Sequence, residues 1–151
     1  MPASHFRLVL DTNTLLRGAV SETSAAAKLL VAAEERRFVT LLSRPALAEY
    51  RAVLTDPTIV RRFPNLSENR VRITLARLRF CGDYIRNPSI HFEYVRDKRD
   101  AKFIELAIAG RATHIVSCDF DLLSLPTGRT EASRRFRQRL PNVHVLVLVQ
   151  A

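Results

Sequence analysis

The sequence predicts an α/β fold, a three-layer α/β/α sandwich with a central parallel sheet. Short apolar runs suited to buried strands alternate with stretches of helical periodicity, and these runs cover residues 6–10, 38–42, 90–95, 114–118 and 143–149. Such alternation favours parallel strands joined by crossover helices that cover both faces of the sheet. The last run is apolar at nearly every position, which is typical of a parallel strand buried on both faces. The whole chain, residues 1–151, is expected to form one domain.

Helices are predicted between these strands because the intervening stretches begin at capping residues and end at glycine or proline. They are expected at 12–17, before Gly18; from Ser21 or Thr23 to about residue 37; at 44–54, capped by Ser43; from Ser67 to Gly82; and at 101–109, before Gly110. Residues 122–125 are predicted to form a turn of helix or a loop. The stretch after Pro57 reads as a connector, and residues 127–139 as a polar segment without a clear role.

Charge points to a polyanionic partner. Lysine and arginine number 24 against 15 acids, for a net charge of +9, and nearly all the cations are arginine, whose planar guanidinium binds phosphate bidentately. Arg70 with Arg77, like Arg72 with Arg79, recurs at seven residues and is expected to form an exposed stripe. Arg134 and Arg135 lie in a second basic stretch and are further candidates for RNA contact. Ordinary solvated faces in an arginine-rich composition explain the same excess equally well.

Composition also excludes classes of protein. The longest apolar run is far shorter than the ~20 residues that cross a bilayer, and charges near the amino terminus interrupt any signal peptide. A cytoplasmic protein without a membrane partner is therefore expected. The four histidines, at positions 5, 91, 114 and 144, share no metal-ligand spacing and are expected to pack in the core or at sheet edges.

Acidic residues follow the predicted strands. Because the carboxyl ends of parallel strands share one edge of a sheet, where ligands bind in open α/β folds, these acids are expected to converge there. Two carboxylates ~4 Å apart repel by ~4 kcal/mol at an effective dielectric of ~20, so a cluster needs protons or a divalent cation. All-oxygen ligation selects Mg²⁺ or Mn²⁺. The acids concerned are Asp11, Glu49, Asp97, Asp100, Asp119 and Asp121.

Each acid also has a structural interpretation. Asp11 could cap the helix that follows it, and Asp97 with Asp100 could form a near capping box. Asp121 could begin a turn, where aspartate is favoured. Glu49 alone would more often be a solvated helix residue. A capping role and a ligand role are compatible in one residue.

Four segments of the chain together resemble the PIN-domain ribonucleases. They are 9–13 (VLDTN), 43–50 (SRPALAEY), 97–107 (DKRDAKFIELA) and 114–123 (HIVSCDFDLL), and they occur in order with family-like spacing between Leu8 and about Leu123. The resemblance is strongest to the toxin components of bacterial toxin-antitoxin pairs. Serine at 117, where members of the family often have threonine, is a mild departure.

The resemblance implies Mg²⁺- or Mn²⁺-dependent cleavage of single-stranded RNA by an endoribonuclease, with water activated at the metal. By motif, it makes Asp11, Glu49, Asp100 and Asp119 the catalytic acids. Asp11, Asp100 and Asp119 would hold the metal, and the accessory positions would be Asn13, Asp97, Ser117 and Asp121. The resemblance also implies an antitoxin protein as partner, and a homodimer is expected as a further assembly.

Two other functions stay open from the residues alone. A phosphatase with an aspartate nucleophile usually places a second aspartate two residues after the first, where this chain has Asn13. A catalytically silent nucleic-acid-binding or scaffold domain would keep its acids for structural reasons only, and retention of all four acids argues against it. Titration with Mg²⁺ or Mn²⁺ separates these functions, since a scaffold should show no specific stabilisation.

Overall fold

A computed structural model describes residues 6–86, 90–94 and 98–148 and contains a five-stranded parallel sheet. The strand order is β3-β2-β1-β4-β5. The strands are β1 (Arg7–Leu10), β2 (Val39–Leu42), β3 (Asp83–Tyr84), β4 (His114–Val116) and β5 (His144–Leu146). β1 lies at the centre, and its register aligns Leu10 with Val116 of β4. The carboxyl ends of these two strands are therefore neighbours.

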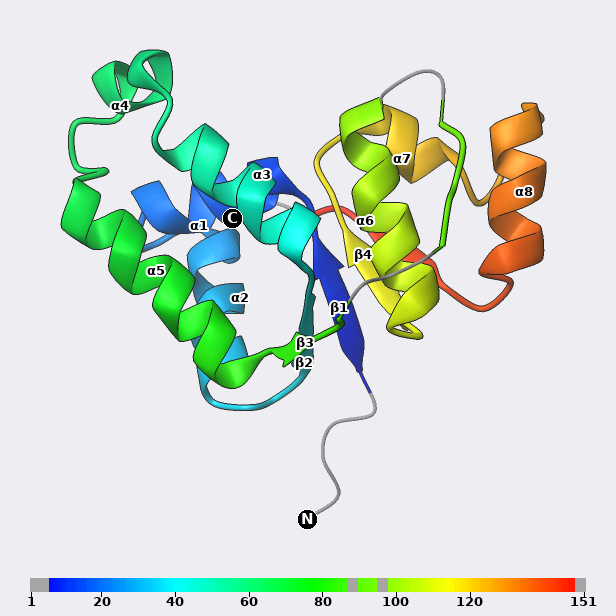
Figure 1. The fold of residues 1–151 in the computed structure, drawn as a ribbon, viewed down its shortest axis with the longest axis horizontal. Helices are drawn as coiled ribbons and strands as arrows, with labels where there is room; N and C mark the ends of the chain where they lie inside the picture. The colour runs from blue at the N-terminus through cyan, green and yellow to red at the C-terminus, as the bar shows by residue number, and fades with distance from the viewer. Residues whose placement is uncertain (1–5, 87–89, 95–97, 149–151) are drawn as a thin grey trace.

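Eight helices connect and cover the strands within the described part of the chain. Figure 1 shows α1, α2, α4 and α5 grouped at one end of the molecule and α6, α7 and α8 at the other. Their bounds are α1 (Thr12–Val20), α2 (Ala25–Glu34), α3 (Arg44–Leu54), α4 (Pro57–Arg62), α5 (Glu68–Cys81), α6 (Lys98–Ala109), α7 (Phe120–Ser124) and α8 (Glu131–Arg139). Among these helices, none is long and apolar enough to cross a membrane.

Alternate residues of β1 enter two separate hydrophobic clusters, as the pleat of a strand requires. Val9 packs in a large cluster with side chains of α3, α5 and α6, which include Tyr50 and Phe103. Leu8 and Leu10 pack in a smaller cluster with Ala33 of α2. Helices therefore cover both faces of the sheet, and the predicted three-layer α/β/α fold is confirmed.

Several predicted helix ends are confirmed and others are wrong. Ser43 caps α3 and Ser67 caps α5, each through its hydroxyl oxygen. The cap of α2 is Ser24, not Ser21 or Thr23. Gly18 does not end α1: it lies inside the helix, where a Cβ atom would come within 2.6 Å of Leu30 on α2. The absence of a side chain at Gly18 lets α1 and α2 pack closely, and a larger residue would require Leu30 to shift.

Two helices, α4 and α8, were not predicted from the sequence. Asp56 caps α4, with its carboxylate accepting from the amide of Thr58 at 2.8 Å. Thr130 caps α8, which makes residues 131–139 of the polar stretch 127–139 helical. Asp56 therefore begins a new helix directly after Thr55, the C-cap of α3.

The strand predicted at 90–95 is wrong over the described residues 90–94, which have no regular secondary structure. Phe92 and Tyr94 are buried while His91 and Glu93 are exposed, so the alternation arises from a segment that packs two aromatic side chains on the protein without joining the sheet. The amide of Phe92 donates to the Glu105 carboxylate of α6 at 2.9 Å. The third strand is instead Asp83–Tyr84, which pairs with β2.

The last strand is at the edge of the sheet and not at its centre. His144 and Leu146 of β5 are exposed, so the expectation that both faces of this strand are buried is wrong. The His144 ring lies 5.4 Å from the His114 ring of β4, between ring centroids. The predicted packing at a sheet edge applies to His144 on the edge strand, whereas His114 lies on an inner strand and is partly buried.

Candidate active site

Asp11 stands directly after β1 and is only 3% exposed. Its Oδ1 accepts from the amide of Thr14 at 2.8 Å, which makes Asp11 the cap of α1. Its Oδ2 accepts from the Ser117 hydroxyl at 2.6 Å and from the Cys118 amide at 3.2 Å. Three donors thus compensate a buried carboxylate that would otherwise be costly to desolvate. The capping interpretation is correct for one oxygen, while the other oxygen binds the loop after β4.

Ser117 connects this carboxylate to a second candidate acid. Its hydroxyl is fully buried, donates to Asp11 and accepts from the amide of Asp119 at 2.9 Å. Asp119 in turn caps α7, since its Oδ1 accepts from the amide of Asp121 at 2.9 Å. The turn after β4 is therefore built around the Asp11 carboxylate, and the predicted proximity of Asp11 and Asp119 follows from that link.

Asp100 lies in the first turn of α6 and is 9% exposed. In Figure 1 the first turn of α6 is at the top of the view, the end toward which β1 and β4 run. The amino end of α6 therefore lies on the side of the sheet toward which β1 and β4 run. Asp97, an accessory candidate, lies outside the described residues. Asn13, in the first turn of α1, is exposed.

Glu49 is held by a lysine that sequence analysis missed. The Lys102 ammonium of α6 lies 2.8 Å from Glu49 Oε1 of α3, and both side chains are largely buried, with 25% and 14% of their surfaces exposed. The interpretation of Glu49 as a solvated residue is therefore wrong. A half-buried pair of this kind needs both partners, because removal of one leaves an uncompensated charge. The pairing depends on how α3 and α6 face each other, and no spacing along the chain indicates it.

Tyr50, the residue after Glu49, fixes α3 to the end of β1. The ring is fully buried and stacks on Phe103 at 5.8 Å, and the hydroxyl donates to the carbonyl of Leu10 at 2.5 Å. Burial, and secondarily the negative charge of Asp11, raise the pKa of the Tyr50 hydroxyl above its usual range. Tyr50 therefore stays a neutral donor. Sequence analysis placed it only on the inward face of its helix.

Comparison with known proteins gives the family. A model of the PIN domain matches residues 7–121, which include the described candidate acids at 11, 49, 100, 119 and 121. The chain belongs to the PIN domain family. A protein of Methanocaldococcus jannaschii, named only as uncharacterized, is 29% identical over 119 residues, which are 79% of this chain and 74% of that protein. PIN domains are generally nucleases that bind nucleic acid and typically use divalent metal ions.

The described acids of this PIN domain do not form a ready-made cluster of metal ligands. No group of three or more His, Cys, Asp or Glu side chains lies close enough to hold a metal ion in residues 6–86, 90–94 and 98–148. Mg²⁺ is usually bound by one or two carboxylates together with water and substrate phosphate. The pair Asp11 and Asp119, with Asp100 in the first turn of α6, supplies the hard oxygen donors that such an ion takes. The donor set therefore fits Mg²⁺ or Mn²⁺ by chemistry.

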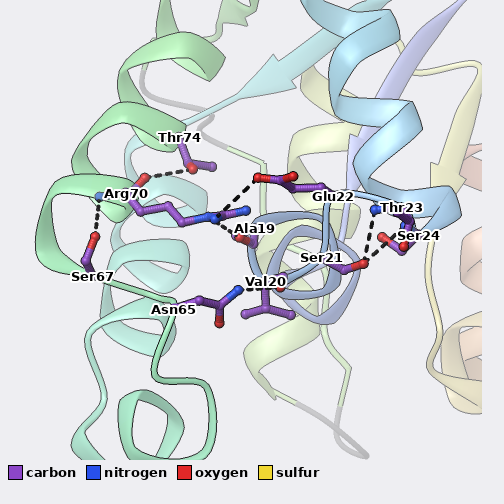
Figure 2. A network of polar contacts seen from close by, with 10 residues as sticks. All are labelled: Ala19, Val20, Ser21, Glu22, Thr23, Ser24, Asn65, Ser67, Arg70 and Thr74. Carbon is purple, nitrogen blue, oxygen red and sulfur yellow. Dashed lines mark hydrogen bonds and ion pairs between the residues drawn. The ribbon is translucent and has the colours of Figure 1, made fainter.

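Arg70, predicted to contact RNA, is used inside the PIN domain. Its Nε donates to the carbonyl of Ala19 at 2.7 Å, and Asn65 donates to the carbonyl of Val20 at 2.7 Å (Figure 2). These bonds satisfy the last carbonyls of α1, which have no partner within the helix. The Arg70 side chain is 31% exposed, and its guanidinium also lies 4.0 Å from Glu22. The expectation of a fully exposed stripe is therefore wrong at Arg70.

The other arginines predicted for RNA binding differ in how free they are to meet a phosphate. Arg77 is 64% exposed and lies 3.6 Å from Glu34. Arg134 is exposed on α8. The guanidinium of the adjacent Arg135 lies 3.4 Å from the Glu93 carboxylate and 3.1 Å from the Glu131 carboxylate, one helical turn earlier. Arg77 and Arg134 are thus better placed for an external ligand than Arg70 and Arg135.

Proposed function

We propose that this protein is a Mg²⁺- or Mn²⁺-dependent endoribonuclease that cleaves single-stranded RNA. The observation that supports the proposal is the link from the Asp11 carboxylate through the Ser117 hydroxyl to the backbone amide of Asp119, which follows the end of a neighbouring parallel strand. Membership of the PIN domain family supports nuclease chemistry. The net charge of +9 supports a polyanionic substrate.

Each residue of the site has a distinct part in this proposal. Asp11, Asp100 and Asp119 are proposed to hold the ion together with water and phosphate oxygens, since no three of the described acids already form a group that could hold a metal ion. Ser117 fixes the orientation of the Asp11 carboxylate. A bound divalent ion supplies Lewis-acid activation of water and neutralises charge on the phosphate. Glu49, which is paired with Lys102, is the fourth acid of the proposed site. The accessory positions are Asn13, Asp97, Ser117 and Asp121. No side-chain nucleophile is required.

The sharpest test is Asp119→Asn. Asparagine is as good a helix cap as aspartate, so the cap of α7 is kept while the charge is lost. Divalent-dependent cleavage of single-stranded RNA should fall by at least about 10–100-fold, the loss typical when a supporting group of a metal site is removed. Asp56→Asn is the matched control, because Asp56 caps the short helix α4 through the same kind of bond. Full activity in Asp119→Asn would refute the assigned role.

Product ends test the reaction itself. Attack by water should leave a 5′-phosphate and a 3′-hydroxyl, whereas attack by the 2′-hydroxyl of RNA would leave a cyclic phosphate. The measurement is end analysis of RNA incubated with the purified protein and Mn²⁺ or Mg²⁺. If the purified protein binds RNA and never cleaves it, a binding or scaffold role replaces the nuclease.

We further propose that the protein acts in the cytoplasm as the toxin of a toxin-antitoxin pair. The support is the resemblance of its four motif segments to toxin components of this family. A small antitoxin protein would cover the acidic edge, and a homodimer is the proposed assembly. The test combines induced expression in the native host with recovery of bound proteins. Normal growth on induction, with no small protein recovered, would remove the toxin role and leave the nuclease.

A further inference from the structure

An aromatic ring stands in solvent beside the candidate active site. Phe120 is 77% exposed and lies between Asp119 and Asp121 in the sequence, as the first residue of α7. Single exposed apolar residues are ordinary on protein surfaces, so exposure alone assigns no function. The position of this ring, one residue from an acid proposed to hold the ion, is the feature to explain.

Phe120 differs from the other strongly exposed phenylalanines of the described chain. Phe6 meets the ring of His114 edge-on at 5.3 Å, and Phe80 lies under the guanidinium of Arg36 at 5.9 Å. Within residues 6–86, 90–94 and 98–148, no aromatic ring or guanidinium lies against Phe120. Both faces of the Phe120 ring are therefore without an aromatic or cationic partner among those residues.

The backbone that carries this ring is fixed from within the protein. The amide of Asp119 donates to the Ser117 hydroxyl at 2.9 Å, and the amide of Asp121 donates to the Asp119 carboxylate at 2.9 Å. The amide of Leu123 donates to the carbonyl of Asp119 at 3.0 Å. Three hydrogen bonds therefore hold the turn around Phe120, and a ring on a preformed turn loses little backbone freedom when a ligand binds it.

A hollow of about 380 Å³ lies beside the same helix. Asp121 and Ser124 contribute polar groups to its wall, where Arg135 is paired with Glu93 and Glu131, and the buried Tyr94 also lines it. Ser124 is one helical turn after Phe120, so the two residues share one side of α7. A nucleotide next to a base on Phe120 would find hydrogen-bonding groups in this hollow.

We propose that Phe120 stacks on a base of the RNA and so positions the neighbouring phosphate at the acidic edge. This inference rests on the proposed ribonuclease function. Stacking on an aromatic side chain requires a base that is free of its own helical stack, and it tolerates any base because every base has a π face. Phe120 therefore selects single-stranded over paired RNA and contributes little sequence preference.

Fluorescence tests the stacking directly, because the chain contains no tryptophan. Phe120→Trp introduces one indole at the proposed platform, and Phe80→Trp introduces one at a phenylalanine of similar exposure on α5, 82% against 77%. Both are made in an Asp100→Asn background to suppress cleavage. A single-stranded oligoadenylate with Mg²⁺ should quench the emission of the Phe120→Trp protein strongly, and that of the Phe80→Trp protein, whose indole lies one helical turn from Arg77, much less. A duplex of the same sequence should quench neither.

Kinetics give a second measurement that does not depend on tryptophan. Phe120→Leu removes the π face and should raise KM for single-stranded RNA by about 5–150-fold, the loss expected for one base stack. Phe120→Tyr should restore KM, while kcat stays within about threefold in both variants, a difference of ~0.7 kcal/mol in barrier.

Two outcomes separate this inference from the proposed function. If the unmodified protein cleaves RNA, but emission of the Phe120→Trp protein does not change at saturating RNA and KM is equal in Phe120→Leu and Phe120→Tyr, stacking is refuted and the ribonuclease stands. If the unmodified protein neither binds nor cleaves RNA, both are refuted.

Discussion

Replacement of Ser117 by alanine tests whether one hydroxyl organises the acidic edge. The change removes a hydrogen bond to the buried Asp11 carboxylate, worth ~1.5–3 kcal/mol for a charged acceptor, and leaves the Asp119 amide without its acceptor at a further ~1–3 kcal/mol. The two losses share one site and are not additive, so the free energy of unfolding should fall by roughly 3 kcal/mol. For a protein of 151 residues that corresponds to a fall in Tm of about 6–12 °C.

Ser133 of α8 supplies the matched control. It is 2% exposed, and its hydroxyl oxygen accepts from the Thr130 hydroxyl at 3.1 Å, a neutral partner. Ser133→Ala should therefore cost only about 1 kcal/mol. Urea and thermal unfolding of both variants, followed by circular dichroism, give the comparison. If Ser117→Ala costs no more than Ser133→Ala, the Asp11 carboxylate does not depend on the serine and the account of the site is wrong.

Four further changes follow from single contacts. Tyr50→Phe leaves the buried carbonyl of Leu10 without its donor and should lower the free energy of unfolding by ~1–3 kcal/mol in urea titration. Lys102→Met should lower it by ~1–3 kcal/mol because Glu49 stays largely buried without its cation, and adding Glu49→Gln should restore part of the loss. If Arg134 contacts a phosphate, Arg134→Ala should reduce the salt dependence of RNA binding by about 0.7 log units per decade. Burial, and secondly the charge of His144, lower the pKa of His114. The unfolded chain therefore binds more protons than the folded protein, and the free energy of unfolding should fall as the pH drops below about 6.5. This fall should be smaller in His114→Gln.

The sheet was predictable where apolar runs end in acids, and less so elsewhere. β1 and β4 pair in parallel register, so acids after their last residues had to share one edge. The strand prediction for residues 90–94 was wrong because an alternating pattern shows which side chains are buried, but not which groups the backbone hydrogen-bonds to. Phe92 turns inward, but its amide bonds to a glutamate side chain of α6 and not to a strand.

Contacts between side chains of two different helices could not be predicted from the sequence. Lys102 and Glu49 are 53 positions apart on α6 and α3, and they meet only because the large core cluster sets how these helices face each other. The spacing of seven residues between Arg70 and Arg77 predicts an exposed side chain, yet the Arg70 guanidinium hydrogen-bonds to the carbonyl of Ala19 near the end of α1. Periodicity gives the side of a helix a residue occupies, but not which unsatisfied carbonyl lies beside it.

Capping and chemistry share the same carboxylates, and this decides which variants can report on function. The sequence suggests that Asp11→Asn keeps the fold and removes only the ligand, but the structure argues otherwise. Both Asp11 oxygens accept from N–H or O–H donors, so an amide group in either orientation turns its own N–H toward one of the donors, Thr14, Ser117 or Cys118. Lost cleavage in that variant would mix lost stability with lost chemistry. Asp119 accepts through a single oxygen in its cap, so asparagine preserves the bond, and its loss of activity reports on charge alone.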